Sequence, residues 1–205
     1  MEKSPLLLFD LGGVLIENHT FPRLRDLLDR PFDDDTLKHR WLESPAVIGF
    51  EHGRLTPAEF ASGFLAEWNL ELAPGELLEE FTGWPARYFP GATRVLRELS
   101  GRHRLACLSN SNELHWARYN GFREHFDPAL SSHLLGVMKP DPRAFRLAVE
   151  HCGVPAAEIL FFDDLPANVE AARAAGMQAF HVQGFGELEA VLRSEGLLTG
   201  SADSD

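Results

Sequence analysis

Two short apolar runs of this sequence end in acidic residues. Leu6–Phe9 is followed at once by Asp10, and Ile159–Phe162 is followed by the pair Asp163 and Asp164. Each run has the length and composition of a buried strand that delivers carboxylates to its end. A hydrophobic core has no use for charge at these points, whereas a metal-assisted reaction requires it. The two runs therefore predict a chemical site built from carboxylates.

Further polar residues follow other apolar stretches. The strand predicted at Arg104–Leu108 leads into Ser109 and Asn110, and Lys139 lies in the loop Gly136–Pro140. Strands that alternate with helices form a parallel sheet with helices on both faces, and ligands bind at the carboxyl ends of its strands. We therefore expect an α/β fold, a doubly wound parallel sheet of Rossmann-like type, with these polar residues gathered on one edge.

The elements that must position these residues can be predicted from periodicity and caps. The expected strands are Leu6–Phe9, Arg104–Leu108, Pro128–Leu130, Ile159–Phe162 and Ala179–Val182. The helices expected to alternate with these strands are Ala92–Leu99, Glu113–Tyr119, Pro142–Cys152, one that begins at Pro166, and Glu187–Glu195. Asp141 is the expected cap of the third of these helices, and the C′ glycine Gly176 is expected to end the fourth.

The segment from Glu17 to Tyr88 has helical periodicity and no convincing strand. Its expected helices are Phe21–Asp29, Thr36–Leu42, Pro57–Trp68 with a capping box from Thr56 to Glu59, and one from Pro74, with a loop at Phe50–Arg54. We predict residues 17–88 to be an inserted helical cap domain. Residues 1–16 and 89–199 then form the core domain, and 200–205 a disordered tail.

The composition excludes several classes of partner. The chain has 205 residues, is 44% hydrophobic and 24% charged, and carries a formal net charge of −12. Such an acidic chain with no basic block is unsuited to nucleic acid or anionic membrane. Cys107 and Cys152 are best interpreted as buried thiols in a reducing cytoplasm. No run has the roughly 18 apolar residues that a membrane span requires. Asp10 interrupts the apolar stretch near the start, which argues against a signal peptide.

The four motifs together resemble the haloacid dehalogenase-like hydrolase superfamily. They are Phe9–Leu15, Leu108–Asn110, Met138–Asp141, and Phe161–Asp164 with Asn168, followed by Ala171–Ala172 and Gly176–Met177. The resemblance covers about Leu6 to Val182, and the insertion after the first motif is similar to the helical-cap members. A branch that resembles sugar 1-phosphate phosphatases has the same Asp-x-Gly pattern in its first motif.

The resemblance implies a role for each motif residue. Asp10 would be the nucleophile toward phosphorus and a ligand of Mg²⁺. Asp163 would bind the metal directly, Asp164 directly or through water, and Gly12 through its backbone carbonyl. Ser109 and the backbone N–H of Asn110 would bind phosphoryl oxygens, and Lys139 would neutralise the phosphate and the nucleophile. Asn168 is more simply a support for the fourth-motif loop.

Gly12 departs from the pattern of most phosphatases of the family, which carry a general acid and base, Asp, at that position. Loss of a general acid typically costs ~10²–10⁴-fold in rate, and less with a good leaving group. We expect a Mg²⁺-dependent phosphatase of a small phosphorylated metabolite, such as a sugar phosphate. The alternatives are a haloacid dehalogenase-type hydrolase, which would not need the metal-binding acid pair, or a catalytically weak relative that only binds a phosphorylated ligand.

Other residues are candidates to replace the missing acid or to select the substrate. His19 follows the first motif and His115 lies on the helix after the second, although a surface or packing role is the simpler interpretation of both. Glu51 or Arg54 in the cap could select the leaving group, against the simpler interpretation of a solvated loop. Phosphonate cleavage through a cap lysine is disfavoured because the cap offers only Lys38. The substrate, and the choice between monomer and homodimer, stay open.

Overall fold

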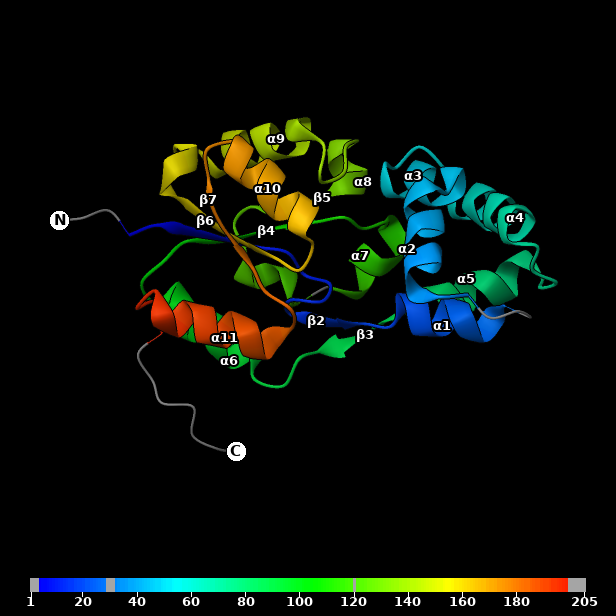
Figure 1. Cartoon of the computed structure of the whole chain (residues 1–205), viewed down its shortest axis with the longest axis horizontal. Coiled ribbons are helices and arrows are strands. Elements are labelled where there is room, and N and C mark those ends of the chain that lie inside the picture. Colours follow the sequence, from blue (N-terminus) through cyan, green and yellow to red (C-terminus); the bar gives the residue numbers. More distant parts are fainter. Residues whose placement is uncertain (1–3, 29–31, 120, 199–205) are drawn as a thin grey trace.

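A five-stranded parallel sheet lies at the centre of the computed structural model, which describes residues 4–28, 32–119 and 121–198 (Figure 1). The strand order is β5-β4-β1-β6-β7. The bounds are β1 (Leu6–Phe9), β4 (Leu105–Ser109), β5 (Ala129–Ser131), β6 (Ile159–Asp163) and β7 (Gln178–His181). The central strand β1 is buried along its whole length and pairs with β4 and β6, in parallel. The predicted α/β fold class is confirmed.

Helices cover both faces of this sheet. They are α6 (Ala92–Ser100), α7 (Glu113–Arg118), α8 (Ser132–Leu135), α9 (Pro142–Cys152), α10 (Pro166–Ala174) and α11 (Phe185–Ser194), with 3₁₀ turns at Arg123–His125 and Ala156–Glu158. Figure 1 shows α9 and α10 on one face and α6 and α11 on the other. Alternate residues of β1 serve the two faces: Leu7 and Phe9 pack in the cluster of α6 and α11, and Leu6 and Leu8 in that of α9. Such two-sided burial explains why the strand is apolar throughout.

A second group of helices forms its own core beside the sheet. These are α1 (Thr20–Leu27), α2 (Asp34–Glu43), α3 (Pro45–Glu51), α4 (Pro57–Trp68) and α5 (Pro74–Thr82). Their core is aromatic, and in it Trp41 contacts the rings of Phe64, Phe81 and Trp84 with centroids 5.9–6.5 Å apart. The predicted capping box at Thr56 is present, and both of its hydrogen bonds form. The division of the chain into a core domain, residues 1–16 and 89–199, and a cap domain, residues 17–88, stays a prediction.

The prediction of no strand between Glu17 and Tyr88 was wrong. Strand β2 (Ile16–Asn18) pairs antiparallel with β3 (Pro85–Tyr88) where the chain passes between the sheet and the second group of helices. These strands have three and four residues, too few to establish an alternating pattern in the sequence. Their pairing joins the two connections to the helical group.

The predicted loop Phe50–Arg54 was wrong in its first part, because Phe50 and Glu51 end helix α3. The signal for this helix was present in the sequence: Ser44 caps it by accepting a hydrogen bond from the Val47 N–H, and Pro45 is its first residue. Its seven residues and an internal glycine, Gly49, hid the periodicity. The short helix α8 was also not predicted.

The predicted helix ends at Asp141 and Gly176 and the predicted buried thiols are confirmed within the described residues. Asp141 caps α9, and Gly176 has a φ of +91° just beyond α10. Cys107 and Cys152 are buried free thiols. No described helix has both the length and the apolar character that a bilayer crossing requires. The predicted end of the first cap helix at Asp29 and the tail 200–205 lie outside the described residues.

Candidate active site

The register of the sheet brings the predicted acids together. Phe9 of β1 lies opposite Phe162 of β6, and the Asp10 N–H donates to the Phe162 carbonyl at 2.9 Å. Asp10 and Asp163 are therefore neighbours at the carboxyl edge. One carboxylate oxygen from each of Asp10, Asp163 and Asp164 lies within 4.8 Å of the others, and this group could hold a metal ion.

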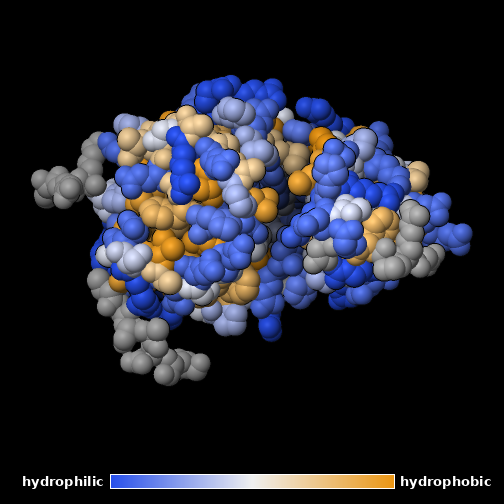
Figure 2. All heavy atoms as spheres, viewed as in Figure 1, coloured by the Kyte–Doolittle hydropathy of each residue, from blue (hydrophilic) through white to orange (hydrophobic). Residues whose placement is uncertain are grey.

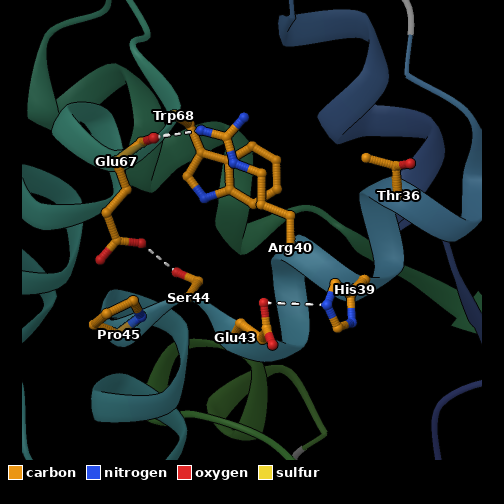
Figure 3. A pocket seen from close by; sticks show the side chains of 8 residues that line it. All are labelled: Thr36, His39, Arg40, Glu43, Ser44, Pro45, Glu67 and Trp68. Carbon is orange, nitrogen blue, oxygen red and sulfur yellow. Dashed lines mark hydrogen bonds and ion pairs between the residues drawn. The ribbon is translucent and has the colours of Figure 1, made fainter.

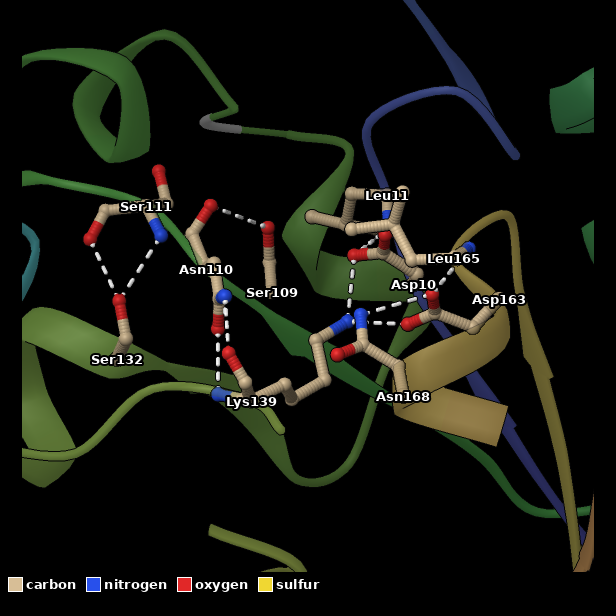
Figure 4. Close-up of polar contacts among 10 residues, drawn as sticks. All are labelled: Asp10, Leu11, Ser109, Asn110, Ser111, Ser132, Lys139, Asp163, Leu165 and Asn168. Carbon is tan, nitrogen blue, oxygen red and sulfur yellow. Dashed lines mark hydrogen bonds and ion pairs between the residues drawn. The ribbon is translucent and has the colours of Figure 1, made fainter. Parts of the chain in front are cut away.

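Lys139 lies between two of these acids with its side chain 1% exposed (Figure 4). Its Nζ is 3.0 Å from Asp10 Oδ1 and donates to Asp163 Oδ2 at 2.7 Å. Burial acts to lower the pKa of Lys139, but the carboxylates of Asp10 and Asp163 outweigh it and hold that pKa above its usual range. The lysine therefore stays charged between its partners.

The side chain of Asn110 positions the Lys139 loop. Its Nδ2 donates to the Lys139 carbonyl, and its Oδ1 accepts from the Lys139 N–H, both at 2.8 Å. Both ends of this amide are thus engaged, so the backbone N–H is the part of Asn110 that fits the predicted phosphate contact. Ser109, at the end of β4, is buried and lines the same cavity as Asp10 and Lys139.

The two acids that follow β6 have different surroundings. Asp163 is fully buried and accepts three hydrogen bonds, from the Leu165 N–H, Asn168 Nδ2 and Lys139 Nζ. The Asp164 carboxylate has no hydrogen bond to another described residue. The Asp164 carboxylate is therefore less engaged by protein donors than that of Asp163, and the metal roles that the resemblance implies for both residues stay a prediction. Asn168 supports the loop through Asp163, as predicted.

Burial and the neighbouring carboxylates raise the pKa of Asp10. Burial is the main cause, Lys139 opposes it, and Asp163 and Asp164 add to it, so that the pKa reaches about 8. Burial and the charge of Asp163 likewise raise the pKa of Asp164, to about 6. One ammonium does not neutralise three carboxylates, and a divalent cation bound by oxygen ligands would supply the missing positive charge.

The adjacent glycines of the first motif differ in what they require. Gly13 has a φ of +78°, and a Cβ there would lie 2.4 Å from Asp164 Oδ2, so this position needs glycine. A Cβ on Gly12 would meet only Asn18 Nδ2, at an ordinary 3.5 Å. Neither the backbone nor the packing at Gly12 excludes a side chain. The acid that most family phosphatases carry there is therefore missing for another reason.

A cavity of about 700 Å³ opens from this acidic edge toward the second group of helices. The sheet side contributes Asp10, Gly12, Ser109, Lys139 and Asp164, among others, and the helical side contributes Phe21, Lys38, Trp41, Leu42 and Glu51. In Figure 2 a dark hollow separates the two halves of the molecule, with hydrophobic residues at its rim. Bound molecules would thus touch both halves.

The other candidate residues lie in different places. His19 lines the cavity, with its side chain 48% exposed and Nε2 3.8 Å from Glu17. His115 is buried, and both of its ring nitrogens have partners, the Phe81 carbonyl at 2.7 Å and Asn112 Nδ2 at 3.1 Å. Burial lowers its pKa to about 4, so it stays neutral. Arg54 is exposed and does not line the cavity, whereas Glu51 does.

A smaller pocket of about 330 Å³ lies within the helical group (Figure 3). Its polar groups bind one another: Arg40 donates to the Glu67 carbonyl and lies over the Trp68 ring, and Ser44 donates to the Glu67 carboxylate. The Glu67 carboxylate also accepts from the Ala46 N–H at the start of α3. These contacts explain the pocket as part of the support for α3.

Comparison with known proteins agrees with this geometry. The model of the haloacid dehalogenase-like hydrolase family matches residues 5–176. Fructose-1-phosphate phosphatase YqaB of Escherichia coli is 35% identical over 195 residues, which are 89% of this chain and 98% of that protein. Phosphatase MT3486 of Mycobacterium tuberculosis is 37% identical over 107 residues, and the match spans half of this chain and about half, 49%, of that relative's length.

A solved structure supports the fold. An enzyme of the same family from Bacteroides thetaiotaomicron, in complex with magnesium and inorganic phosphate, superposes with a TM-score of 0.72 at 22% identity, over 87% of this chain and 93% of that one. The family match covers strands β1, β4, β5 and β6 and all four motifs, so the chain belongs to the haloacid dehalogenase-like hydrolases.

Proposed function

We propose that this protein is a Mg²⁺-dependent phosphatase that hydrolyses a small phosphorylated metabolite through a phosphoryl group carried on Asp10. The observation that supports it most is the cluster of Asp10, Asp163, Asp164 and buried Lys139, of which Asp10, Asp164 and Lys139 line the 700 Å³ cavity. A carboxylate nucleophile beside a positively charged lysine, with further carboxylates that can bind a metal ion, suits the transfer of an anionic phosphoryl group.

Each residue of the cluster has a distinct part in the proposed reaction. Asp10 Oδ1 accepts from the Leu11 N–H and faces Lys139, which leaves Oδ2 to attack phosphorus. The bond from phosphorus to the leaving oxygen breaks as the bond to Asp10 forms. Water then attacks the phosphoryl group and releases inorganic phosphate and the free carboxylate. Ser109 and the Asn110 N–H bind the phosphoryl oxygens while Lys139 compensates their charge.

The residues present fit a hard divalent cation. Oxygen atoms of Asp10 and Asp164 and the Gly12 carbonyl would hold Mg²⁺, and Asp163 would contribute its remaining lone pairs while it holds Lys139. When bound, the ion neutralises the repulsion between the carboxylate nucleophile and the phosphate. The related enzyme crystallised with magnesium and inorganic phosphate supports this proposal.

For the substrate, we propose a sugar phosphate as the first class to examine. The relative that covers most of this chain's length among those described above is named a fructose-1-phosphate phosphatase. A leaving group that departs easily also suits a first motif without the family's acid at Gly12. A cytoplasmic location is part of the proposal and is supported by the two free buried thiols, Cys107 and Cys152.

The alternatives are less well supported. A haloacid dehalogenase-type hydrolase would have no need of the clustered Asp163 and Asp164. A protein that only binds a phosphorylated ligand accounts for Gly12, but not for a nucleophile held 3.0 Å from a buried lysine.

One experiment separates these functions. The protein would be assayed against a panel of sugar phosphates and p-nitrophenyl phosphate, with Mg²⁺ and with a chelator. We expect phosphate release that stops on chelation and returns with Mg²⁺. Metal-independent chloride release from 2-chloropropionate would instead establish the dehalogenase, and binding of a phosphate ester without turnover would establish the binder.

A further inference from the structure

We propose that Glu51, on the helical side of the cavity, is the catalytic acid and base that Gly12 does not supply. This side of the cavity lining is called the cap wall below, and the opposite side, which carries Asp10 and Lys139, the sheet wall. The Glu51 carboxylic acid protonates the leaving oxygen, and the resulting carboxylate then takes a proton from the attacking water. This inference rests on the proposed phosphatase function. It assigns to a residue on the opposite wall the part that the first motif lacks.

The structure fixes the end of α3 that carries Glu51. The start of the helix is capped by Ser44 and by the Glu67 carboxylate, which accepts from the Ala46 N–H at 2.8 Å. Near its end, Phe50 is buried and stacks on Phe60 of α4, with ring centroids 4.5 Å apart. Glu51 is thus attached to a packed element rather than to a solvated loop.

The turn after Glu51 docks on the sheet side of the molecule. Gly53 has a φ of +68°, and a Cβ there would lie 2.3 Å from the carbonyl oxygen of His133 in α8. Only glycine permits this approach of two backbones. The contact ties the end of α3 to the segment that follows β5, and thereby sets where Glu51 lies relative to the sheet.

The Glu51 side chain lines the cavity that contains the reacting groups. It lines the same cavity as Asp10, Gly12 and Lys139, and its carboxyl group has no hydrogen bond or ion pair to another described residue. Lys139 and Tyr119 are within electrostatic range of it. An acid with no hydrogen-bonding partner that lines the same cavity as the proposed nucleophile is available for chemistry.

The surroundings of Glu51 also suit proton transfer. Burial raises its pKa to about 7, and Lys139 acts against that rise. Lys38 of α2 lines the cavity as well, and His133 of α8 lies against the turn beyond Glu51. Catalytic acids work best when their pKa lies near the working pH, because both protonation states are then accessible.

Neighbouring titratable groups are less suitable. His115 stays neutral with both nitrogens engaged. Burial, with Asp10 adding to it, raises the pKa of Tyr119 above its usual range, which makes its hydroxyl a weak acid. His19 is about half exposed and adjoins Glu17.

Glu51 gives up one proton and takes one back during each catalytic cycle of the proposed reaction. In the first half, the P–O bond to the leaving group breaks, the P–O bond to Asp10 forms, and the leaving oxygen takes the Glu51 proton to become a hydroxyl. In the second half, water attacks phosphorus, its proton passes to Glu51, and the bond to Asp10 breaks. Glu51 ends in its starting state, and no oxidant or further reactant is needed.

Two aryl phosphates of nearly equal shape test the inference. p-Nitrophenyl phosphate has a good leaving group that departs without a proton, whereas phenyl phosphate has a poorer one. In Glu51→Gln we expect kcat/KM for phenyl phosphate to fall about 100-fold or more, and that for p-nitrophenyl phosphate to fall less than about 10-fold. Glu43→Gln, a charge-matched change at an exposed residue of α2, should leave both rates unchanged.

A second variant makes the test specific to the proton. Gly12→Asp restores an acid where the structure has room for one, so Glu51→Gln with Gly12→Asp should recover most of the lost activity toward phenyl phosphate. Equal losses with both substrates, without recovery by Gly12→Asp, would overturn the role of Glu51 while the phosphatase assignment stands. If the unaltered protein hydrolyses neither these esters nor sugar phosphates with Mg²⁺, the proposed function itself fails.

Discussion

The two walls of the cavity are built in opposite ways. On the sheet wall, Asp10, Lys139 and Asp163 are joined by ion pairs and hydrogen bonds of 2.7–3.0 Å. On the cap wall, Glu51 has no polar partner among the described residues, and its neighbours in the lining include aromatic rings such as Trp41. Side chains that are held by hydrogen bonds and ion pairs keep reacting atoms at fixed positions. A side chain without such partners can form its hydrogen bonds with a bound substrate. In the proposed reaction, attack on phosphorus therefore takes place at the sheet wall, whereas substrate selection and proton transfer take place at the cap wall.

The walls also differ in what holds them in place. The sheet wall takes its position from the register of β1, β4 and β6, with long-range pairing on both sides of β1. The cap wall takes its position from the aromatic core of its own helices and from the close approach of Gly53 to His133. Variants on the two walls should therefore affect different quantities.

The largest effect is expected at Asp10. Asp10→Asn removes the nucleophile, so we expect kcat to fall roughly 10⁴-fold or more. Because the carboxylate is buried beside two others, the neutral amide should leave the free energy of unfolding of the metal-free protein unchanged or higher. Phosphate-release assays and urea unfolding would measure the two effects. Asp35→Asn, at an exposed position of α2, is the control, and substantial turnover by Asp10→Asn would place the nucleophile elsewhere.

A matched pair of lysines compares the walls directly. Lys139→Met leaves two buried carboxylates uncompensated, so we expect roughly 10³-fold lower kcat/KM and about 3 kcal/mol lower free energy of unfolding. Lys38→Met on the cap wall should change kcat/KM by less than about 10-fold, mainly through KM. Steady-state kinetics and urea titrations provide both numbers. Similar effects of the two variants would contradict the division of roles between the walls.

The two glycines of the first motif form a third comparison. Gly13→Ala should lower the free energy of unfolding by about 2 kcal/mol, because of its positive φ and its approach to Asp164. It should also weaken Mg²⁺-dependent activity by displacing that carboxylate. Gly12→Ala should cost less than about 1 kcal/mol. Thermal unfolding of the two variants measures the difference, and equal costs would mean that the strain at Gly13 is absent in solution.

An effect that appears only at acidic pH concerns His115, which links α7 to the Phe81 carbonyl of α5. Its pKa is lowered from 6.5 to about 4 by burial, so the unfolded chain binds a proton that the folded chain does not. This contribution to stability is complete above about pH 6.5 and is lost as pH falls toward 4, by about 2 kcal/mol at pH 5. Urea unfolding at several pH values would measure it. His115→Gln should flatten the slope, the exposed His39→Gln should keep it, and an unaltered slope in His115→Gln would assign the acid sensitivity to other groups.

Much of the sheet wall could be predicted from the sequence because its signals are local. A run such as Ile159–Phe162 can only be buried, and the acids after it then lie at a strand end. Caps such as Asp141 and the Thr56–Glu59 box are likewise read from neighbouring residues. The family resemblance supplied roles for these residues. The structure places Lys139 within hydrogen-bonding distance of Asp10 and Asp163, and a carboxylate oxygen of Asp164 within 4.8 Å of theirs.

The cap wall could not be predicted in the same way. Glu51 lies in a short stretch with weak periodicity, and nothing adjacent to it in the sequence indicates that it faces a cavity. Its place in the cavity lining and its electrostatic interaction with Lys139 depend on α3 packing on α4 and on the turn at Gly53 meeting α8. Strands β2 and β3 were missed for a related reason, since each is too short to be recognised without its partner.

The sequence by itself determined the α/β class, the strand ends that carry Asp10, Ser109, Asp163 and Asp164, and the absence of an acid at Gly12. These follow from hydrophobic patterns and residue types, which act over a few neighbouring positions. Only the tertiary structure decided that Asp163 is held by three donors while the Asp164 carboxylate has none from another described residue, that Gly13 rather than Gly12 must be glycine, and that Glu51 lines the same cavity as Asp10 and Lys139. Each of these depends on contacts between segments far apart in the chain.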